Sequence, residues 1–263
     1  MSFRIATFNV NSVRSRLPIL ERWLPTAGVD LLCMQETKVV DADFPAAAFE
    51  ALGYKTYFHG EKSYNGVALA SRYPLKDVRF GFGDGEEPSF DTRVVRARLN
   101  DIVVLNTYVP QGKEITHPDY GVKKRFLDRV RALFDMEQLQ NVPFVWLGDI
   151  NVAPADADVT NPQNKKEHVC FHHEIREKFE SVCSWGLTDL LRRFHPEAGV
   201  YTFFDYRVKD ALSRNIGWRI DHILANAALA GTARDCFVET APRGWERPSD
   251  HTPLVADFEI ALP

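Results

Sequence analysis

Polar side chains suited to binding a cation or moving a proton stand where apolar, strand-like runs of the chain end. The first run ends in Asn9 and Asn11, the second in Glu36, and a later one in Asp149 and Asn151. Comparable positions hold a phenol, two carboxylates and an imidazole, namely Tyr108, Asp221, Asp250 and His251. One such residue alone commonly caps a strand, but together they predict an active site at one edge of a sheet sandwich. Carboxylate and amide oxygens with a single imidazole favour a hard cation such as Mg²⁺ or Mn²⁺ over zinc.

Eight apolar runs predict the strands that position these residues, and several are apolar on both faces, which indicates burial between layers. They are residues 3–10, 30–35, 66–71, 93–99, 102–109, 144–147, 220–224 and 254–258. Helical patterns cover residues 16–24, with Ser15 as N-cap, and residues 172–185. A third helix is predicted over residues 121–139, with its basic residues facing outward. Strands and helices are mixed without strict alternation, so two packed sheets covered by helices are favoured over a Rossmann fold.

The 263-residue chain has no internal repeat, low-complexity tract or linker, so we expect one domain over residues 1–263. No apolar run approaches the roughly 18 residues that span a bilayer, and the start of the chain lacks a signal-peptide pattern. The net charge of −4 argues weakly against a polyanionic partner, although carboxylates gathered around a cation can conceal a basic rim. Four widely spaced cysteines indicate free thiols in a reducing cytoplasm: Cys33, Cys170, Cys183 and Cys236.

Taken in order, the polar segments resemble the exonuclease III family of abasic-site endonucleases, and the resemblance covers essentially the whole chain. The segments that carry it are Phe8-Asn9-Val10-Asn11, Gln35-Glu36-Thr37-Lys38, Asn65-Gly66-Val67-Ala68, Tyr108-Val109-Pro110-Gln111-Gly112, Gly148-Asp149-Ile150-Asn151, Arg219-Ile220-Asp221 and Ser249-Asp250-His251. The metal and acid–base residues alone would also fit the wider superfamily of DNase I-like nucleases, inositol-polyphosphate phosphatases and sphingomyelinases. The DNA-repair branch is favoured by residues 35–38 and 108–112, and by residues 203–207 followed by 217–221.

The resemblance implies a four-layer α/β sandwich of two packed mixed β-sheets flanked by helices. It also implies a monomeric enzyme of base excision repair that acts on double-stranded DNA with abasic sites or blocked 3′ ends. Such an enzyme cleaves the phosphodiester 5′ of an abasic site by in-line attack of water and leaves a 3′-hydroxyl. It also has 3′-to-5′ exonuclease and 3′-end-cleaning activity. The implied cofactor is Mg²⁺, with Mn²⁺ as a substitute.

By the same resemblance, Glu36 is the principal metal carboxylate, Asp149 activates water or shuttles a proton, and Asn151 holds the phosphate or the water. His251 would contact the scissile phosphate, with Asp221 fixing its tautomer and favouring the imidazolium. The residues implied around the metal are Asn9, Glu36, Asp149, Asn151, Asp250 and His251. The residues implied in catalysis are Tyr108, which donates to the phosphate or stabilises charge, together with Asp149, Asn151, Asp221 and His251.

The resemblance also implies a set of DNA contacts. Phe203 and Trp218 would wall a pocket for a flipped-out sugar that has lost its base, and core packing is the alternative for both. The remaining residues of the set are Asn11, Arg14, Lys38 and Asn164. Other basic residues in or beside predicted loops are Arg16, Lys62, Arg72, Lys165 and Lys166, for which ordinary solvated surface charge is the alternative.

Three other interpretations are weaker. His168, Cys170, His172 and His173 fall within six residues, but their spacing lacks the paired ligands of a zinc finger, and a helix would separate the last two. A phosphatase or lipid phosphodiesterase of the same superfamily would need an apolar membrane-facing loop or a phosphoinositide-reading motif, and the sequence has neither. A binding protein without chemistry is disfavoured because the expected metal and acid–base residues are all present.

Overall fold

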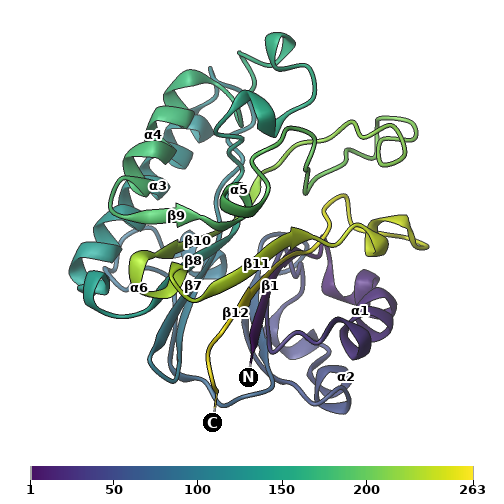
Figure 1. Ribbon diagram of the computed structural model, residues 1–263, viewed down its shortest axis with the longest axis vertical. Helices are drawn as coiled ribbons and strands as arrows, with labels where there is room; N and C mark the ends of the chain where they lie inside the picture. The colour runs from purple at the N-terminus through teal and green to yellow at the C-terminus, as the bar shows by residue number, and fades with distance from the viewer. Residues whose placement is uncertain (1, 263) are drawn as a thin grey trace.

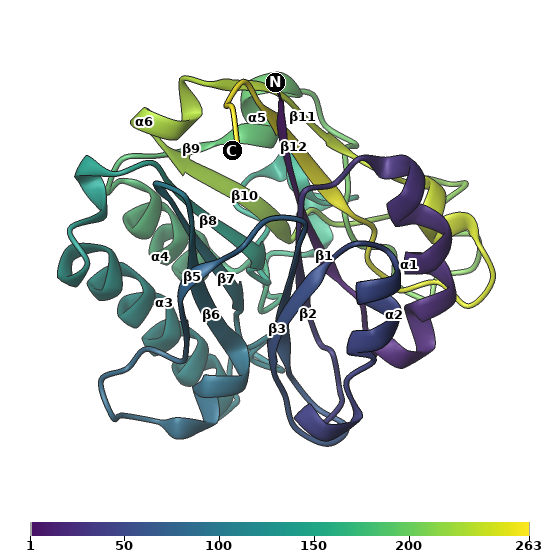
Figure 2. The same ribbon diagram turned by 90° about the horizontal axis from the view of Figure 1, so that it is seen from below.

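Two six-stranded β-sheets lie face to face, with helices on the outer face of each (Figure 1 and Figure 2). The computed structural model describes residues 2–262. The first sheet has the order β11 (Ala233–Val238), β12 (Leu254–Phe258), β1 (Phe3–Asn9), β2 (Leu31–Gln35), β4 (Val67–Ser71), β3 (Lys55–His59). The second has the order β5 (Lys76–Phe80), β6 (Val94–Leu99), β7 (Ile102–Tyr108), β8 (Phe144–Asp149), β10 (Asp221–Asn226), β9 (Leu187–Asp189).

The α-helices are α1 (Val13–Ala27), α2 (Ala46–Ala51), α3 (Pro118–Met136), α4 (His173–Cys183), α5 (Leu190–Phe194) and α6 (Ala227–Ala230). Single 3₁₀ turns cover Asp41–Asp43, Pro88–Arg93, Leu139–Asn141, Asp156–Asp158, Pro162–Asn164 and Ala241–Gly244. Figure 2 shows α1 and α2 beside the first sheet and α3 and α4 beside the second. Within residues 2–262, no helix is long and apolar enough to cross a membrane.

Three buried apolar clusters fill the three interfaces between these four layers. Trp23 lies in the cluster under α1, Leu147 in the cluster between the sheets, and Phe126 in the cluster under α3. Both sheets combine parallel and antiparallel pairs. The four-layer α/β sandwich of two mixed sheets expected from the sequence is therefore confirmed.

Strand directions bring several polar strand ends to one edge of this sandwich. β1 runs parallel to β2, and β7 runs parallel to β8, so Asn9, Tyr108 and Asp149 stand at carboxyl ends. β10 is antiparallel to β8 and begins at Asp221, which pairs with Asp149. β12 is antiparallel to β1 and begins three residues after His251. Ends of six strands therefore contribute to the same edge.

A buried amide pair ties the two sheets together directly beneath this edge. Nε2 of Gln35 in β2 donates to Oδ1 of Asn106 in β7 at 2.6 Å and to Oγ1 of Thr7 in β1 at 2.9 Å. Nδ2 of Asn106 donates back to the carbonyl oxygen of Met34 at 3.0 Å. Hydrogen bonds between buried amides require a defined separation and register, so they fix how the two sheets meet below the site.

Two helices begin earlier than the sequence predicts. The N-cap of α1 is Ser12 rather than Ser15, because the Ser12 side chain accepts the main-chain N–H of Ser15. α3 begins at Pro118 after the N-cap His117, since a proline needs no hydrogen-bond partner for its nitrogen in the first turn.

Candidate active site

A short chain of hydrogen bonds joins the two sheets at the polar edge. Nδ2 of Asn9 donates to Oε1 of Glu36 at 2.8 Å and to Oδ2 of Asp149 at 2.9 Å. Asn9 and Asp149 are fully buried. β8 approaches β7 closely here because residue 148 is glycine: a Cβ at Gly148 would lie 2.0 Å from the carbonyl oxygen of Thr107. The amide of Asn9 thus holds two carboxylates, one from each sheet, within one site.

Lysine and amide groups extend this chain toward Asp250. Nζ of Lys38 lies 2.6 Å from Oε2 of Glu36 and 2.6 Å from Oδ1 of Asn11. Nδ2 of Asn11 in turn donates to Oδ1 of Asp250 at 3.0 Å. Burial acts to raise the pKa of Glu36, but the charge of Lys38 and the hydrogen bonds from Asn9 and Lys38 outweigh it and leave that pKa below its ordinary value. Glu36 is therefore ionised at neutral pH.

Four of these site residues have left-handed backbone, with φ of 43° at Asn11, 51° at Glu36, 54° at Lys38 and 55° at Asn151. Such a conformation costs a non-glycine residue of order 1 kcal/mol and persists only where surrounding contacts enforce it. One such contact is the main-chain N–H of Ser12, which donates to the carbonyl oxygen of Glu36 at 2.7 Å. Backbone strain of this kind gathers at functional sites, which agrees with the position of these residues.

His251 and Asp221 form a buried pair beside Asp149. Nδ1 of His251 lies 2.8 Å from Oδ2 of Asp221, and Nε2 lies 3.7 Å from Oδ2 of Asp149. Burial lowers the pKa of His251, but Asp221 and Asp149 raise it by more, to about 10. Burial raises the pKa of Asp149 to about 7, with His251 opposing the increase and Asp221 adding to it. The raised pKa favours the imidazolium form of His251, and Asp149 can take up a proton near neutral pH.

Tyr108 stands between the carboxylates and an arginine. The guanidinium of Arg93 lies 4.6 Å from the centre of the Tyr108 ring, and it donates to the carbonyl oxygen of Tyr108 at 3.2 Å. Burial, followed by the charges of Glu36 and Asp149, raises the pKa of Tyr108 well above its usual value. The side chain therefore remains a phenol that can donate a hydrogen bond. Sequence reasoning missed Arg93, which carries no motif and precedes an apolar strand.

The side chain of Asn151 is held from two directions. Its Nδ2 donates to the carbonyl oxygen of Val109 at 3.0 Å, and its Oδ1 faces Sγ of Cys170 at 3.8 Å. With the oxygen turned toward Cys170, the second N–H of the amide is the group left to meet a phosphate. Sequence reasoning considered Cys170 only as part of a zinc cluster that it set aside, and so missed this contact with Asn151.

The donor set favours carboxylate ligands for a cation. One ligand atom each of Asp149, Asp221 and His251 lie within 4.8 Å of one another. Nδ1 of His251 is held by Asp221 at 2.8 Å, so Nε2 is the atom left for the metal role expected from the sequence, and that role stays a prediction. Glu36, Asp149 and Asp250 supply the oxygen donors that suit a hard cation.

A cleft of about 620 Å³ opens beside these residues. Its polar lining includes Glu36, Tyr108, Asp149, Asn151, Asp250 and His251. Phe203, Trp218 and Ile220 contribute an apolar wall. The ring of Phe203 lies 5.0 Å from the ring of His251, and the main-chain N–H of Trp218 donates to the carbonyl oxygen of Phe203 at 2.9 Å. Both aromatic residues singled out from the sequence therefore lie at the cleft.

His168 and Lys165 complete this wall. The His168 ring lies 4.5 Å from the Trp218 ring, and Nζ of Lys165 lies 5.5 Å from the centre of the same ring. Burial, followed by the charges of Lys123 and Lys165, lowers the pKa of His168 to about 4, so its ring is neutral at pH 7. Sequence reasoning missed His168 as a cleft residue. Asn164, which it favoured, is exposed and does not line the cleft.

Residues 6–251 match the endonuclease/exonuclease/phosphatase family. The chain belongs to this family. The exodeoxyribonuclease III of Haemophilus influenzae is 32% identical over 97% of this chain and 100% of its own length. The DNA repair nuclease APEX1 of Danio rerio is 30% identical over 96% of this chain and 81% of its own length. The resemblance to the exonuclease III branch of the endonuclease/exonuclease/phosphatase family is thereby confirmed.

Solved structures of the same family agree. An AP endonuclease from Archaeoglobus fulgidus has a TM-score of 0.95 and 46% identity, and the match covers 98% of this chain and 100% of that one. The 3′-5′ exonuclease NExo from Neisseria meningitidis has a TM-score of 0.93 and 37% identity, with the same coverage. Both matches cover nearly the whole of each chain, so the sequence motifs that carry the resemblance all lie within the one fold that these proteins share.

Four of the basic residues singled out from the sequence lie outside the cleft lining: Arg14, Lys62, Arg72 and Lys166. Arg14 of α1 is 3.8 Å from Asp43, and neither lines the cleft. The expectation that Arg72 stands near the site is wrong. β4 is antiparallel to β2, so its last residue, Ser71, pairs with Leu31 at the start of β2, opposite the end that carries Glu36. Lys62 and Lys166 are exposed outside the cleft lining.

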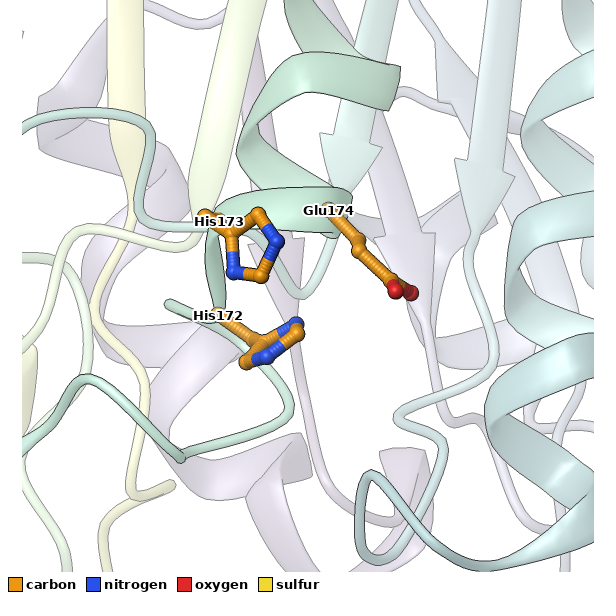
Figure 3. Close-up of side chains that lie close together, drawn as sticks. All are labelled: His172, His173 and Glu174. Atoms are coloured by element: carbon orange, nitrogen blue, oxygen red, sulfur yellow. The ribbon is translucent and has the colours of Figure 1, made fainter.

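The histidines of residues 168–173 lie in two places: His168 is at the cleft, and His172 and His173 are at the start of α4. The expectation that a helix separates His172 from His173 is wrong, because His172 is the N-cap of α4 and the two ring centres are 4.2 Å apart. Ligand atoms of both and of Glu174 lie within 4.8 Å of one another, as Figure 3 shows at the start of α4. His172 already contacts the hydroxyl of Tyr120 at 3.1 Å, and Glu174 is paired with Lys124 at 2.9 Å.

Proposed function

We propose that this protein is a divalent-metal-dependent DNA-repair nuclease. It hydrolyses the phosphodiester 5′ of an abasic site to leave a 3′-hydroxyl, and it removes nucleotides and blocking groups from 3′ ends. The observation that carries the proposal is that Glu36, Asp149 and His251 meet in a buried site that opens into a cleft walled by Phe203 and Trp218. The names of the exodeoxyribonuclease III of Haemophilus influenzae and the AP endonuclease of Archaeoglobus fulgidus support it.

The whole chain would work as one catalytic domain and as a monomer. A cytoplasmic location is part of the proposal, and it is supported by the four cysteines, all of which are free thiols.

Glu36 and Asp250 would hold Mg²⁺, with Asp149 within reach. The fit rests on the ionised carboxylate of Glu36 and on the ammonium of Lys38, a positive charge that already lies 2.6 Å from that carboxylate. A cation bound there polarises a phosphoryl oxygen and neutralises charge on the leaving 3′-oxygen. Mn²⁺ prefers similar oxygen ligands and is expected to substitute.

The protein side chains act on the attacking water and on the phosphate. Asp149 accepts a proton from the attacking water, because burial raises its pKa into the range where a carboxylate is an effective base. His251, kept protonated by Asp221, donates from Nε2 to a phosphate oxygen. The free N–H of Asn151 and the hydroxyl of Tyr108 donate to the same group. The water oxygen bonds to phosphorus as the bond to the 3′-oxygen breaks, and the leaving oxygen takes a proton from solvent water, which leaves a 3′-hydroxyl and a 5′-phosphate.

Selection of damaged DNA would depend on the cleft wall. Phe203 and Trp218 offer apolar surface to a deoxyribose, and a nucleotide without a base costs less to extrude because no stacking is lost. Nζ of Lys165 stands over Trp218, and Arg207 on the rim is 89% exposed on its side chain and paired with Asp205 at 2.7 Å. These two cations suit the phosphates that flank the extruded residue.

Three labelled duplexes test the proposal: one with a single synthetic abasic site, one with a 3′-phosphate, and one intact. The proposal expects cleavage of the first and end-cleaning of the second in Mg²⁺, both abolished by EDTA and restored by added Mg²⁺. Hydrolysis of a phosphoinositide or sphingomyelin without action on DNA would identify a different branch of the family.

A further inference from the structure

A lysine with no exposed surface lies directly behind the site. Lys123 is on α3, and its Nζ donates to three main-chain carbonyl oxygens, those of Asn151 at 2.7 Å, Val169 at 2.8 Å and Gln111 at 3.1 Å. Three acceptors match the three hydrogens of an ammonium group. A neutral amine has only two hydrogens and would turn its lone pair toward one of these oxygens, so the geometry fits the charged form.

The sequence pattern placed the basic residues of this helix on its outer face, and for Lys123 that prediction is wrong. Lys123 lies three and four residues before the buried Phe126 and Leu127, so helical spacing puts it on the same inward face. This spacing is the signal that could have found it.

The three carbonyls belong to three separate segments of the cleft. Gln111 follows β7 and Tyr108, Asn151 follows β8 and Asp149, and Val169 stands between His168 and Cys170. Gln111, Asn151, His168 and Cys170 all line the cleft. α3 itself is anchored in the apolar cluster under the second sheet. One ammonium group on a fixed helix therefore connects every segment that frames this side of the site.

Asn151 receives the closest support. Besides the bond to its carbonyl oxygen, Nζ of Lys123 lies 4.0 Å from Sγ of Cys170, which in turn faces Oδ1 of Asn151 at 3.8 Å. The left-handed φ of 55° at Asn151 needs such support.

The charge has a cost and a compensation. Burying an ammonium is costly, but Nζ of Lys123 meets three main-chain carbonyl oxygens that an apolar side chain of the same length would leave without this donor. The neighbouring inward positions, Phe126 and Leu127, hold apolar side chains.

We propose that Lys123 is a positioning residue: its ammonium holds the segments around Gln111, Asn151 and Val169 so that the amide of Asn151 meets the scissile phosphate. This assignment rests on the proposed function, because it names the group that supports one of its phosphate contacts. Lys123 itself does not line the cleft.

The test compares Lys123→Met with two matched controls on the same helix. Leu127→Ala removes a buried side chain that has no donor for the three carbonyls, and Lys124→Met removes a lysine whose partner is Glu174 on the surface. Each variant is assayed with Mg²⁺ on a 3′-phosphate duplex, well below its own Tm. Lys123→Met should lower kcat by about 10²-fold with KM changed less than about threefold, because misplacing a reacting group by about 1 Å has that effect. Both controls should keep kcat within about twofold.

Hydrogen exchange gives a second measurement that does not depend on the variant's activity. In the wild type, amides around Gln111, Asn151 and Val169 should exchange as one cooperative unit, and in Lys123→Met all three should exchange faster while Leu127→Ala leaves their relative order unchanged. Wild-type kcat in Lys123→Met, or a loss equal to that of Leu127→Ala at equal loss of Tm, overturns the proposal.

If Lys123→Met does not fold, hydrogen exchange in the wild type still tests the proposal. Unrelated exchange rates in the three wild-type segments overturn the proposal in that case. If the wild type is inactive on every DNA substrate, the proposed function fails, whereas the exchange result still decides the role of Lys123.

Discussion

Nδ1 of His251 lies 2.8 Å from Oδ2 of Asp221, and both side chains are buried beside Asp149. An exposed pair of this kind would contribute little, but a buried one holds the imidazole in a single orientation and in its charged form. Nε2 of His251 lies 3.7 Å from Asp149, and burial raises the pKa of that carboxyl to about 7. In the proposed function His251 is the hydrogen-bond donor and Asp149 the proton acceptor.

Asp221→Asn should narrow the pH range of activity from the alkaline side. Asp221 is the largest influence that raises the pKa of His251 to about 10, so its removal lets the imidazolium lose its proton at lower pH. The alkaline limb of kcat/KM should move down by about one to three pH units. At pH 7 kcat should fall by about 10–100-fold, as is usual when the partner of a functional histidine is lost. A pH–rate profile identical to that of the wild type would make His251 a structural residue.

Glu36→Gln should weaken the binding of Mg²⁺ and lower turnover. An amide of the same size keeps the contact with Asn9 but loses the charge, so Mg²⁺ affinity should fall strongly and turnover by about 10²-fold or more. Calorimetric titration with Mg²⁺ and an activity assay over a range of Mg²⁺ concentrations measure both. Glu50→Gln, an exposed substitution on α2, is the matched control and should titrate like the wild type. Equal affinity in Glu36→Gln and Glu50→Gln would remove Glu36 from the metal site.

Phe203→Ala should weaken selection of abasic DNA without disturbing the phosphate contacts. The ring lies at the cleft and against His251, whereas the carboxylates do not use it. The ratio of kcat/KM on an abasic duplex to that on undamaged 3′ ends should therefore fall, while salt dependence stays unchanged because no phosphate contact is lost. Phe204→Leu, in a small apolar cluster outside the cleft lining, is the control. If both substrates lose activity by the same factor, Phe203 is core packing.

Arg219→Met should destabilise the whole protein. Arg219 is buried and donates to Asp158 at 2.6 Å and to Asp189 at 2.7 Å, so its loss leaves buried carboxylates without their cation. The free energy of unfolding should fall by about 3–5 kcal/mol in urea denaturation. Arg234→Met breaks an exposed pair with Glu259 and should cost less than about 1 kcal/mol. If both variants lose the same free energy of unfolding, the buried ion pairs of Arg219 contribute no more to stability than the exposed pair of Arg234.

The ion pairs of Asp158 with Arg219 and Arg192 make the free energy of unfolding depend on pH in the acid range. Burial acts to raise the pKa of Asp158, but Arg219 and Arg192 outweigh it and lower that pKa below its ordinary value of 3.8. Stabilisation by the ionised carboxylate is therefore complete above that ordinary value and is lost as the pH falls through the lower, folded-state pKa. Urea denaturation at descending pH should show this loss in the wild type and a smaller one in Arg219→Met.

The strands that the sequence predicted and those it missed differ in burial. The eight predicted runs correspond to β1, β2, β4, β6, β7, β8, β10 and β12, all inside the sheets. The four missed strands are β3, β5, β9 and β11, and they are the four sheet edges. Edge strands such as Lys76–Phe80 are partly exposed and carry charged residues, so they lack the continuous apolar run that marks an interior strand.

The polar residues at the strand ends were predictable for a related reason. A polar side chain directly after a buried strand, such as Asp149 or Glu36, is visible against the apolar run before it. Lys123, Arg93 and His168 are not marked in this way, because their roles depend on contacts between segments 12 or more positions apart or on the packing of one ring against another. The prediction for Arg72 was wrong because a position in a loop does not show at which edge of the sheet that loop lies.

The most direct test of hydrolysis by this site is the chemistry of the product end. A 5′-labelled duplex with one abasic site is incubated with the wild type and with Asp149→Asn, in Mg²⁺ and in EDTA, and each product is then offered to a DNA polymerase. Water attack assisted by Asp149 predicts Mg²⁺-dependent incision 5′ of the site, products that the polymerase extends because they end in a 3′-hydroxyl, and little product from Asp149→Asn. Incision that persists in EDTA, or products that the polymerase cannot extend, would contradict it.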